Sequence, residues 1–315
     1  MRSAALFFLL CAALSVAAFP DKPVQFIVPY PPGGSNDILA RAVGKKLAES
    51  LGKPVLIDNR AGAGGSIGAE LAAKAAPDGH TIAIVSSSFT TNAAVQARLP
   101  FDPVKSFTPV ALVGRGPLVL VVSNGVPAKT AQEFFALAKS RPGKLNYASS
   151  GPGSINQFAA ELLKSSAGID LAHVPYKGMG PATTDVIGGH VDALVASVPS
   201  VMQHVRSGKV RGLGVTTLAA SPAAPGLAPL AAAGAKGYDV ELWWGVVAPA
   251  GLAPAVLSRL NSEINNALAG SEMKEFLLKE GAEAAPMTPQ AFGALIASEI
   301  ERWKKVAAAS GIKAE

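Results

Sequence analysis

Short apolar runs and amphipathic segments alternate along almost the whole chain. Residues 24–28 ("VQFIV") form the first apolar run, and the apolar residues of 38–51 recur at helical spacing. Two further apolar runs, 54–59 and 81–85, enclose a second helical segment. A repeated order of strand and helix predicts an α/β fold with mostly parallel sheets.

A second α/β series begins near residue 130. Thr130 and Glu133 have the spacing of a capping box, which predicts a helix start. The Pro- and Ala-rich segment 221–234 predicts a loop with a brief helix, and Thr288 before Pro289 predicts the start of the last helix. Between them lie further predicted strands at 144–149, 171–176, 191–197 and 209–217 and a helix at 155–168.

Two long apolar runs, 111–122 and 240–248, separate the two series. The helices after the second run have no strands of their own to cover, so we expect them to pack back on the first series. The chain would then cross twice between two lobes, with a hinge and a cleft between them. We predict lobe 1 at 19–116 plus 241–315 and lobe 2 at 117–240.

Three junctions share one design, a strand followed by a Gly- and Ser-rich loop and a helix. They are "PYPPGGSND" (29–37), "NRAGAGGS" (59–66) and "ASSGPGS" (148–154). A helix start leaves backbone N–H groups without partners and carries a partial positive charge, and glycine lets an anion approach closely. Such loops suit a carboxylate held by neutral donors; the alternative is that each loop is only a capped turn.

Two residues of these loops allow more than one interpretation. Ser154 and Gln157 fit a capping box, so Ser154 could serve its helix rather than a ligand. Asp37 could cap the first helix, bind an ammonium group of a ligand, or hold an ordered water.

Two sharper motifs fail on their context. "GGSIG" (64–68) satisfies the G-x-S-x-G pattern of a hydrolase with Ser66 as nucleophile, but several residues separate it from the preceding strand. The same gap weakens "GAGGSIG" as a dinucleotide-binding loop. Trp243 and Trp244 lie on a predicted strand, so one could pack in the core while the other faces the cleft, with core packing of both as the simpler expectation.

The composition predicts the cellular compartment of the protein and limits the kinds of chemistry that it can perform. Residues 1–18 carry one charge, Arg2, and an apolar run that ends in "VAA" before Phe19, which predicts a cleavable signal peptide and a periplasmic protein. Cleavage would remove Cys11, the only cysteine, and with it any disulfide or thiolate chemistry. The net charge of +6 comes from scattered Lys and Arg, so we predict no nucleic-acid partner. The four histidines show no metal-binding spacing, and we predict no metal, cofactor or catalytic residue.

With these motifs in view, the chain resembles the Bug/TctC family, the extracytoplasmic solute receptors of tripartite tricarboxylate transporters. Matching segments include "DKPVQFIVPYPPGGSNDILAR", "FDPVKSFTPVALVGR", "HVPYKGMGPATTDVIGGHVDAL" and "WWGVVAPAG". The resemblance runs from about residue 21 to 251, with a compatible C-terminal helical region.

The resemblance implies a type II periplasmic-binding-protein fold, in which two α/β lobes close on a small ligand that bears a carboxylate. It places the ligand against the loop 30–37, the segment 86–88, the loop 149–154, the turn 176–178 and the segment near residue 197. The residues that it implies for binding are Tyr30, Pro32, Gly33, Gly34, Ser35, Asn36, Asp37, Ser86, Ser87, Ser149, Ser150, Gly153, Ser154, Tyr176, Lys177, Gly178 and Ser197.

The chain departs from the family pattern at Asn36, where threonine is common, and at Pro152, where asparagine is usual. Pro152 lacks a backbone donor and stiffens its loop, so ligand preference does not follow from the resemblance.

Our leading hypothesis is a monomeric periplasmic receptor that captures a small carboxylate and delivers it to the membrane permease subunits of a tripartite transporter. One alternative is a binding protein that signals to a membrane partner, and another is a secreted serine hydrolase using Ser66. The sequence does not distinguish a mono-, di- or tricarboxylate from an acidic amino acid.

Overall fold

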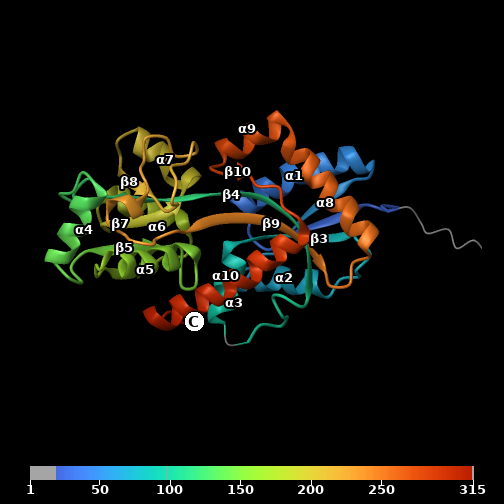
Figure 1. The fold of residues 1–315 in the computed structure, drawn as a ribbon, viewed down its shortest axis with the longest axis horizontal. Helices are drawn as coiled ribbons and strands as arrows, with labels where there is room; N and C mark the ends of the chain where they lie inside the picture. The colour runs from blue at the N-terminus through green and yellow to red at the C-terminus, as the bar shows by residue number, and fades with distance from the viewer. Residues whose placement is uncertain (1–18, 97, 314–315) are drawn as a thin grey trace, which may run out of the picture.

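The computed structural model describes residues 19–96 and 98–313, so the predicted signal peptide (1–18) lies outside the described residues. The molecule is elongated, with one α/β half at each end and two long strands between them (Figure 1).

The first half is a sheet in which β1 lies between β2 and β3, all three parallel, and β9 and β4 continue it antiparallel. Its strands are β1 (Val24–Val28), β2 (Val55–Asn59), β3 (Thr81–Ser86), β4 (Phe107–Val122) and β9 (Glu241–Pro249).

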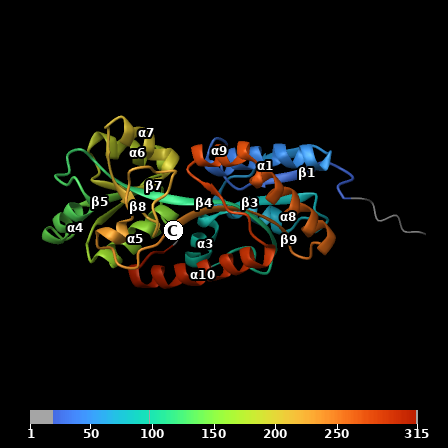
Figure 2. The same ribbon diagram turned by 45° about the horizontal axis from the view of Figure 1, so that its top comes forward.

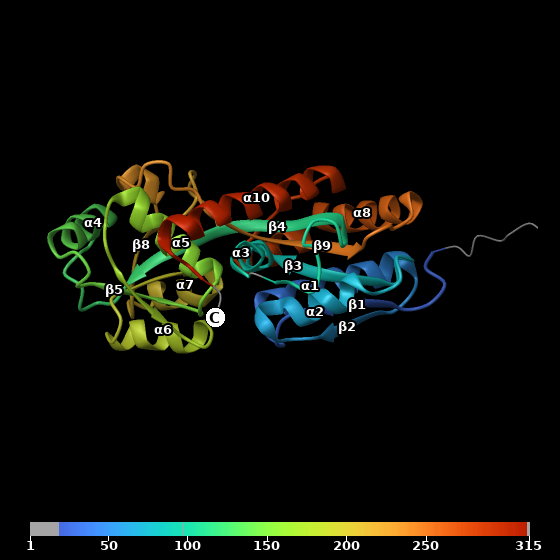
Figure 3. The ribbon, with the colours of Figure 1, turned by 90° about the horizontal axis from the view of Figure 1, so that it is seen from below.

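Helices cover both faces of this sheet (Figure 3). They are α1 (Ser35–Leu51), α2 (Ser66–Ala73) after the short 3-10 turn η1 (Ala63–Gly65), α3 (Ser87–Val95), α8 (Pro254–Ala269), α9 (Ser271–Lys279) and α10 (Pro289–Ser310). Successive side chains of β1 point to opposite faces of the sheet, so each face has its own layer of helices. Phe26 joins the core under α1 and α8, whereas Ile27 joins the core under α2, α3 and α10.

The second half is a smaller sheet in which β5 pairs parallel with β6 and β7, and the end of β4 pairs antiparallel with β7 and β8. Its elements are α4 (Ala131–Ser140), β5 (Asn146–Ser149), α5 (Ile155–Ala167), β6 (Ala172–Pro175), α6 (Met179–Gly188), β7 (Ala193–Ser197), α7 (Val198–Arg206), β8 (Arg211–Val215) and the 3-10 turn η2 (Leu230–Ala233). The predicted α/β class is confirmed.

Strand β4 belongs to both sheets. Up to Pro117 it pairs with β9, and from Leu118 onward it pairs with β7 and β8. The second crossing, in which the chain returns to the first half, is shorter than the predicted strand at 240–248. Strand β9 pairs only with β3 and with the part of β4 that belongs to the first half. Val240 makes the link instead, its N–H donating to Thr216 O at 3.0 Å.

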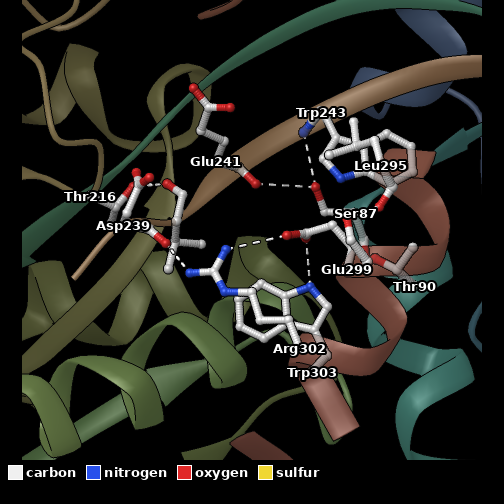
Figure 4. A network of polar contacts seen from close by, with 12 residues as sticks. Ser87, Thr90, Thr216, Asp239, Glu241, Trp243, Leu295, Glu299, Arg302 and Trp303 are labelled. Carbon is white, nitrogen blue, oxygen red and sulfur yellow. Dashed lines mark hydrogen bonds and ion pairs between the residues drawn. The ribbon is translucent and has the colours of Figure 1, made fainter. Parts of the chain in front are cut away.

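Helix α10 ties the halves together on one side of the molecule (Figure 2). Trp303 is fully buried and packs edge-to-face on Phe158 of α5, with ring centroids 5.4 Å apart. Trp303 Nε1 donates to Glu299 Oε2 at 2.7 Å, and the preceding residue, Arg302, donates to both Glu299 Oε1 and the carbonyl of Asp239 (Figure 4). This network holds the helix beside the return crossing.

Most helix starts lie where the sequence predicts them. Thr130, Ser154 and Thr288 each accept a hydrogen bond from the backbone N–H three residues later. Two elements were not predicted, the two-residue strand β10 (Glu283–Ala284), which pairs with β4, and helix α3. Helix α3 begins with Ser and Thr residues of low helix propensity, and tertiary packing holds it while Thr90 Oγ1 bonds back to Ser87 O at 2.8 Å.

Within the described ranges, the structure contains no helix of the length and hydrophobicity that a bilayer crossing requires.

Replacing Trp303 by alanine tests the packing of α10 on α5. Because the side chain is fully buried, the change should lower the free energy of unfolding by about 3–5 kcal/mol. Urea titration followed by far-UV circular dichroism measures the loss. Lys305→Ala, at an exposed position of the same helix, is the matched control and should stay within about 0.5 kcal/mol of wild type. Equal effects of the two substitutions would contradict this packing.

Candidate functional site

A cavity of about 360 Å³ lies between the two halves of the molecule. Seven of the residues expected to bind a ligand line it, and they come from both halves: Gly33, Gly34, Ser35, Asn36, Ser86, Ser150 and Ser197. The structure therefore brings the first loop, the end of β3 and the second half to one place.

Three helices that lack a side-chain cap have N-cap residues that line this cavity. Their N-cap residues are Gly34 for α1, Ser86 for α3 and Ser197 for α7, and all three line the cavity. In each helix the first backbone N–H groups have no partner within the helix, and the N-terminus carries a partial positive charge. The cavity is therefore surrounded by neutral donors and positive helix ends.

Two more helix starts reach the cavity through residues after the N-cap, and α6 lacks a side-chain cap as well. Ile155 and Asn156 at the start of α5 line it, as does Met179 at the start of α6. Helix α5 is capped, however, because Ser154 accepts a hydrogen bond from Gln157 N–H and Gln157 Oε1 accepts one from Gly153 N–H at 2.8 Å. Its first N–H groups are thus partly satisfied within the protein.

Hydrogen bonds hold the polar wall of the second half in place. Ser150 Oγ donates to Asn156 Oδ1 at 2.8 Å, and Asn156 Nδ2 donates to Val195 O at 2.9 Å. Ser197 Oγ and Ser200 Oγ lie 2.8 Å apart. These contacts fix the side chains before any ligand arrives.

Asp37 anchors the loop 29–37 through its hydrogen bonds. Its carboxylate accepts hydrogen bonds from Gly33 N–H at 2.9 Å, Arg41 Nε at 3.0 Å and Asn59 Nδ2 at 3.0 Å. Burial alone raises the pKa of Asp37, but these three partners outweigh burial and lower the pKa to about 2. Asp37 lies outside the cavity lining, and its contacts support a positioning role in place of contact with a ligand.

The two tryptophans of β9 face opposite sides of the sheet, and both are buried. Trp243 packs against Phe292 of α10 with ring centroids 5.6 Å apart. Trp244 lines the cavity, and its Nε1 donates to Ser35 Oγ at 3.3 Å. One tryptophan therefore serves the core, and the other forms a wall of the cavity and steadies the start of α1.

The charge of the lining is unusual for an anion site. Among the described residues that line the cavity, none is Lys, Arg or His, and Glu280 is the one titratable side chain. A carboxylate bound here would be held by backbone amides and hydroxyl groups.

The sequence matches the family described as "Tripartite tricarboxylate transporter family receptor" over residues 39–312. The chain belongs to this family. One relative, the "UPF0065 protein in tcbD-tcbE intergenic region" of Pseudomonas sp. (strain P51), is 41% identical over 290 residues, which cover 92% of this chain and 86% of that protein.

Solved structures agree with the family and confirm the predicted fold. The structure titled "R. palustris Rpa4515 with adipate" superposes with a TM-score of 0.85 at 33% identity, and the match covers 94% of this chain and 99% of that one. "MatC (Rpa3494) from Rhodopseudomonas palustris with bound malate" gives 0.80 at 32% identity, covering 91% and 99%. Proteins of this family are solute-binding receptors, and a further neighbour is titled "periplasmic binding protein BugD", with a TM-score of 0.81, 29% identity and coverage of 94% and 100%.

Several residues that the family resemblance implied lie outside the lining: Tyr30, Pro32, Asp37, Ser87, Ser149, Gly153, Ser154, Tyr176, Lys177 and Gly178. Pro32 and Lys177 are exposed, and Ser154 is occupied as the cap of α5. The contact of these residues with a ligand stays a prediction.

Two serines of that group are fully buried within the protein. Ser87 Oγ donates to Glu241 O at 3.3 Å and accepts from Trp243 N–H at 2.9 Å, so it joins α3 to β9 (Figure 4). Ser149 Oγ lies 2.7 Å from His173 Nε2. Their hydroxyl groups are engaged in holding the scaffold.

The two tyrosines of that group form hydrogen bonds within the protein. Burial raises the pKa of Tyr30, although hydrogen bonds with Ser86 and Ser88 partly offset that rise. Tyr176 Oη donates to Asp185 Oδ2 at 2.5 Å.

Two glycines of the group position neighbouring loops. Gly178 N–H donates to Ser150 O at 3.1 Å, which ties the turn before α6 to the lining. A Cβ at Gly153 would lie 3.3 Å from both Asn92 and Val95 of α3, so this loop reaches across to the first half.

The motif around Ser66 has a structural explanation in this family fold. Ser66 is the first residue of α2 and its Oγ donates to Gln96 Oε1 at 3.4 Å. Among the described residues, no histidine forms a hydrogen bond with Ser66, and no group of three or more His, Cys, Asp or Glu side chains could hold a metal.

The apolar part of the lining was not predicted residue by residue. It consists of Ile38, Leu118, Ile155, Met179, Pro199, Leu242 and Trp244. Leu118 and Leu242 belong to the two long apolar runs, which marked the crossings, but nothing in the sequence indicated which of their side chains face the cavity.

Replacing Asp37 by asparagine tests its role as the anchor of the first loop. A folded-state pKa of about 2, below the ordinary 3.8, means that the stabilisation is present above about pH 4 and is lost as the pH falls towards 2. The shift corresponds to about 2 kcal/mol. Unfolding free energies measured from pH 7 to pH 2 should show this loss in wild type and not in Asp37→Asn.

Asp170→Asn is the control for that experiment, because Asp170 has an exposed side chain far from the first loop in sequence. Its stability curve should run parallel to that of wild type. If Asp37→Asn also ran parallel to wild type down to pH 2, the anchoring role would be wrong.

Proposed function

We propose that this receptor captures a small carboxylate in the cavity between its halves and delivers it to the membrane subunits of a tripartite transporter. The observation that carries the proposal is the presence of three uncapped helix starts, those of α1, α3 and α7, around one cavity. The adipate and malate in the titles of two related structures support it, because both are small carboxylates.

The electrostatics of the cavity favour an anion. Each helix N-terminus acts as roughly +0.5 of an elementary charge, so three of them offset one carboxylate without a lysine or arginine. A hydrogen bond from a neutral N–H to a carboxylate contributes about 1.5–3 kcal/mol. Two or three such bonds would account for the capture of one carboxylate.

The size and the walls of the cavity favour a small, partly aliphatic ligand. Its volume of about 360 Å³ is at the lower end of the usual range for ligand pockets, roughly 300–1,000 Å³. Leu118, Leu242 and Trp244 supply an apolar wall against which a short carbon chain can pack.

The position of the cavity suggests how capture proceeds. We take 19–116 with 241–315 and 117–240 as lobes that rotate about the crossings in β4 and before β9. Closure would press the start of α7 towards the starts of α1 and α3 and exclude water from the bound carboxylate. We further propose that the protein acts as a monomer in the periplasm after removal of residues 1–18, and that the closed form is what the permease recognises.

Thermal unfolding in the presence of mono-, di- and tricarboxylates and acidic amino acids tests the proposal. A ligand at about 100 times its Kd adds about 2.7 kcal/mol to the stability of the folded state. The protein should be unfolded, stripped and refolded first, so that a co-purified ligand does not conceal the response. A flat response to every carboxylate, together with no small molecule in native mass spectrometry of the untreated protein, would contradict it.

Ser35→Pro tests whether the backbone of α1 binds the carboxylate. Proline is well accepted at the first position of a helix, and Gly34 has the extended conformation (φ −82°, ψ 167°) that proline requires before it. The change removes one N–H at the cavity and should weaken carboxylate binding by about tenfold or more, measured by isothermal titration calorimetry. Ser35→Ala keeps the N–H and should lose clearly less; equal losses would argue against a backbone contact.

A further inference from the structure

Glu280 is the one titratable residue among those that line the cavity. It follows the last residue of α9 and is half-buried. Among the described residues, none forms a hydrogen bond or an ion pair with its carboxylate. Burial raises the pKa of Glu280 above its ordinary value, so its negative charge is poorly solvated where it stands.

The backbone next to Glu280 is held firmly. Gly281 has φ +73°, and its N–H donates to Leu278 O at 3.1 Å, which closes the end of α9. A Cβ at Gly281 would lie 2.6 Å from Val198 Cβ and 2.9 Å from Pro199 Cδ, so the turn is pressed against the first residues of α7. Glu280 thus reaches the cavity from the first half at a place where that half contacts the second half.

A carboxylate without a partner is unexpected in a cavity built for anions. An isolated charge in a partly dry site is costly unless an opposite charge or several donors accompany it. The lining provides no cation, because it contains no Lys, Arg or His among the described residues. The missing positive charge would have to arrive with the ligand.

We propose that Glu280 determines specificity by pairing with an ammonium group on the ligand, so that the preferred ligands are aminocarboxylates. This inference rests on the proposed function, since the carboxylate of the same ligand is taken to lie at the starts of α1, α3 and α7. The ligand then spans the cavity with its two charges at opposite sites.

The charge balance favours this class over a plain dicarboxylate. Glu280 and one ligand carboxylate together carry two negative charges, and an ammonium group beside Glu280 forms an opposite-charge pair with it. A second ligand carboxylate in that place would instead add repulsion between two like charges.

Length-matched pairs of ligands test the inference by isothermal titration calorimetry. The pairs are 4-aminobutyrate with succinate, 5-aminopentanoate with glutarate, and 6-aminohexanoate with adipate, and hexanoate reports on the carboxylate site alone. For the length that fits best, wild type should bind the aminocarboxylate at least tenfold tighter than the dicarboxylate. Glu280→Gln, which keeps the shape and removes the charge, should weaken the aminocarboxylate at least tenfold and tighten the dicarboxylate.

Glu275→Gln is the matched control, because Glu275 is exposed on the same helix and does not line the cavity. It should reproduce the wild-type ratio for every pair, and circular dichroism should show that both variants are folded. If dicarboxylates or hexanoate bind wild type and Glu280→Gln leaves the ratio unchanged, the role of Glu280 is wrong while the proposed function stands. If wild type binds none of the seven acids, the role of Glu280 is wrong, and the wider carboxylate panel described above decides the proposed function separately.

Discussion

The account of this protein depends on helix starts that the protein leaves without caps. A buried N–H group without a partner is costly, and a side chain at the N-cap is one common way to satisfy the first N–H groups of a helix. Here α4, α5 and α10 are capped in this way by Thr130, Ser154 and Thr288. Helices α1, α3 and α7 lack a side-chain cap, as do α2, α6, α8 and α9. What distinguishes α1, α3 and α7 is that their N-cap residues line one cavity, where a ligand can reach the free N–H groups.

The arrangement of the strands explains why these helix starts meet. In a parallel sheet, each helix begins at the carboxyl edge of the strand before it, and ligands gather at that edge. Strands β1 and β3 place α1 and α3 there in the first half, and β7 places α7 there in the second. Because β4 runs through both sheets, the two carboxyl edges face one cavity. The two chain crossings and the packing of α10 on α5 join the halves.

Much of this organisation could be predicted from the sequence, because it depends on local patterns. Periodicity indicated the alternating strands and helices, and the Thr130–Glu133 and Ser154–Gln157 spacings marked helix starts that the structure contains. The glycine-rich loop 29–37 could be connected with an anion because glycine and a helix start suffice for that argument. Helix α3 was not predicted, because its first residues have low helix propensity and tertiary packing stabilises the helix.

The finer selection within the site depended on three-dimensional contacts. Ser87 and Ser149 belong to the segments expected at the ligand, yet both hydroxyl groups are turned into the scaffold. Asp37 had three open interpretations, namely a helix cap, an ammonium ligand or a water ligand. Its contacts with Gly33, Arg41 and Asn59 support a fourth role, an anchor of the first loop. Nothing in the sequence indicated Glu280, because a glutamate at the end of a surface helix is common. Only the structure shows that the turn after α9 packs against α7 and that Glu280 lines the cavity.

The central claim is that neutral backbone donors of helices from both halves hold the carboxylate of the ligand. A crystal structure of the receptor with a bound carboxylate tests it most directly. The account predicts carboxylate oxygens within about 2.7–3.2 Å of backbone N–H groups at the start of α1 and at the start of α3 or α7. A carboxylate paired instead with lysine or arginine side chains, or bound outside this cavity, would contradict it.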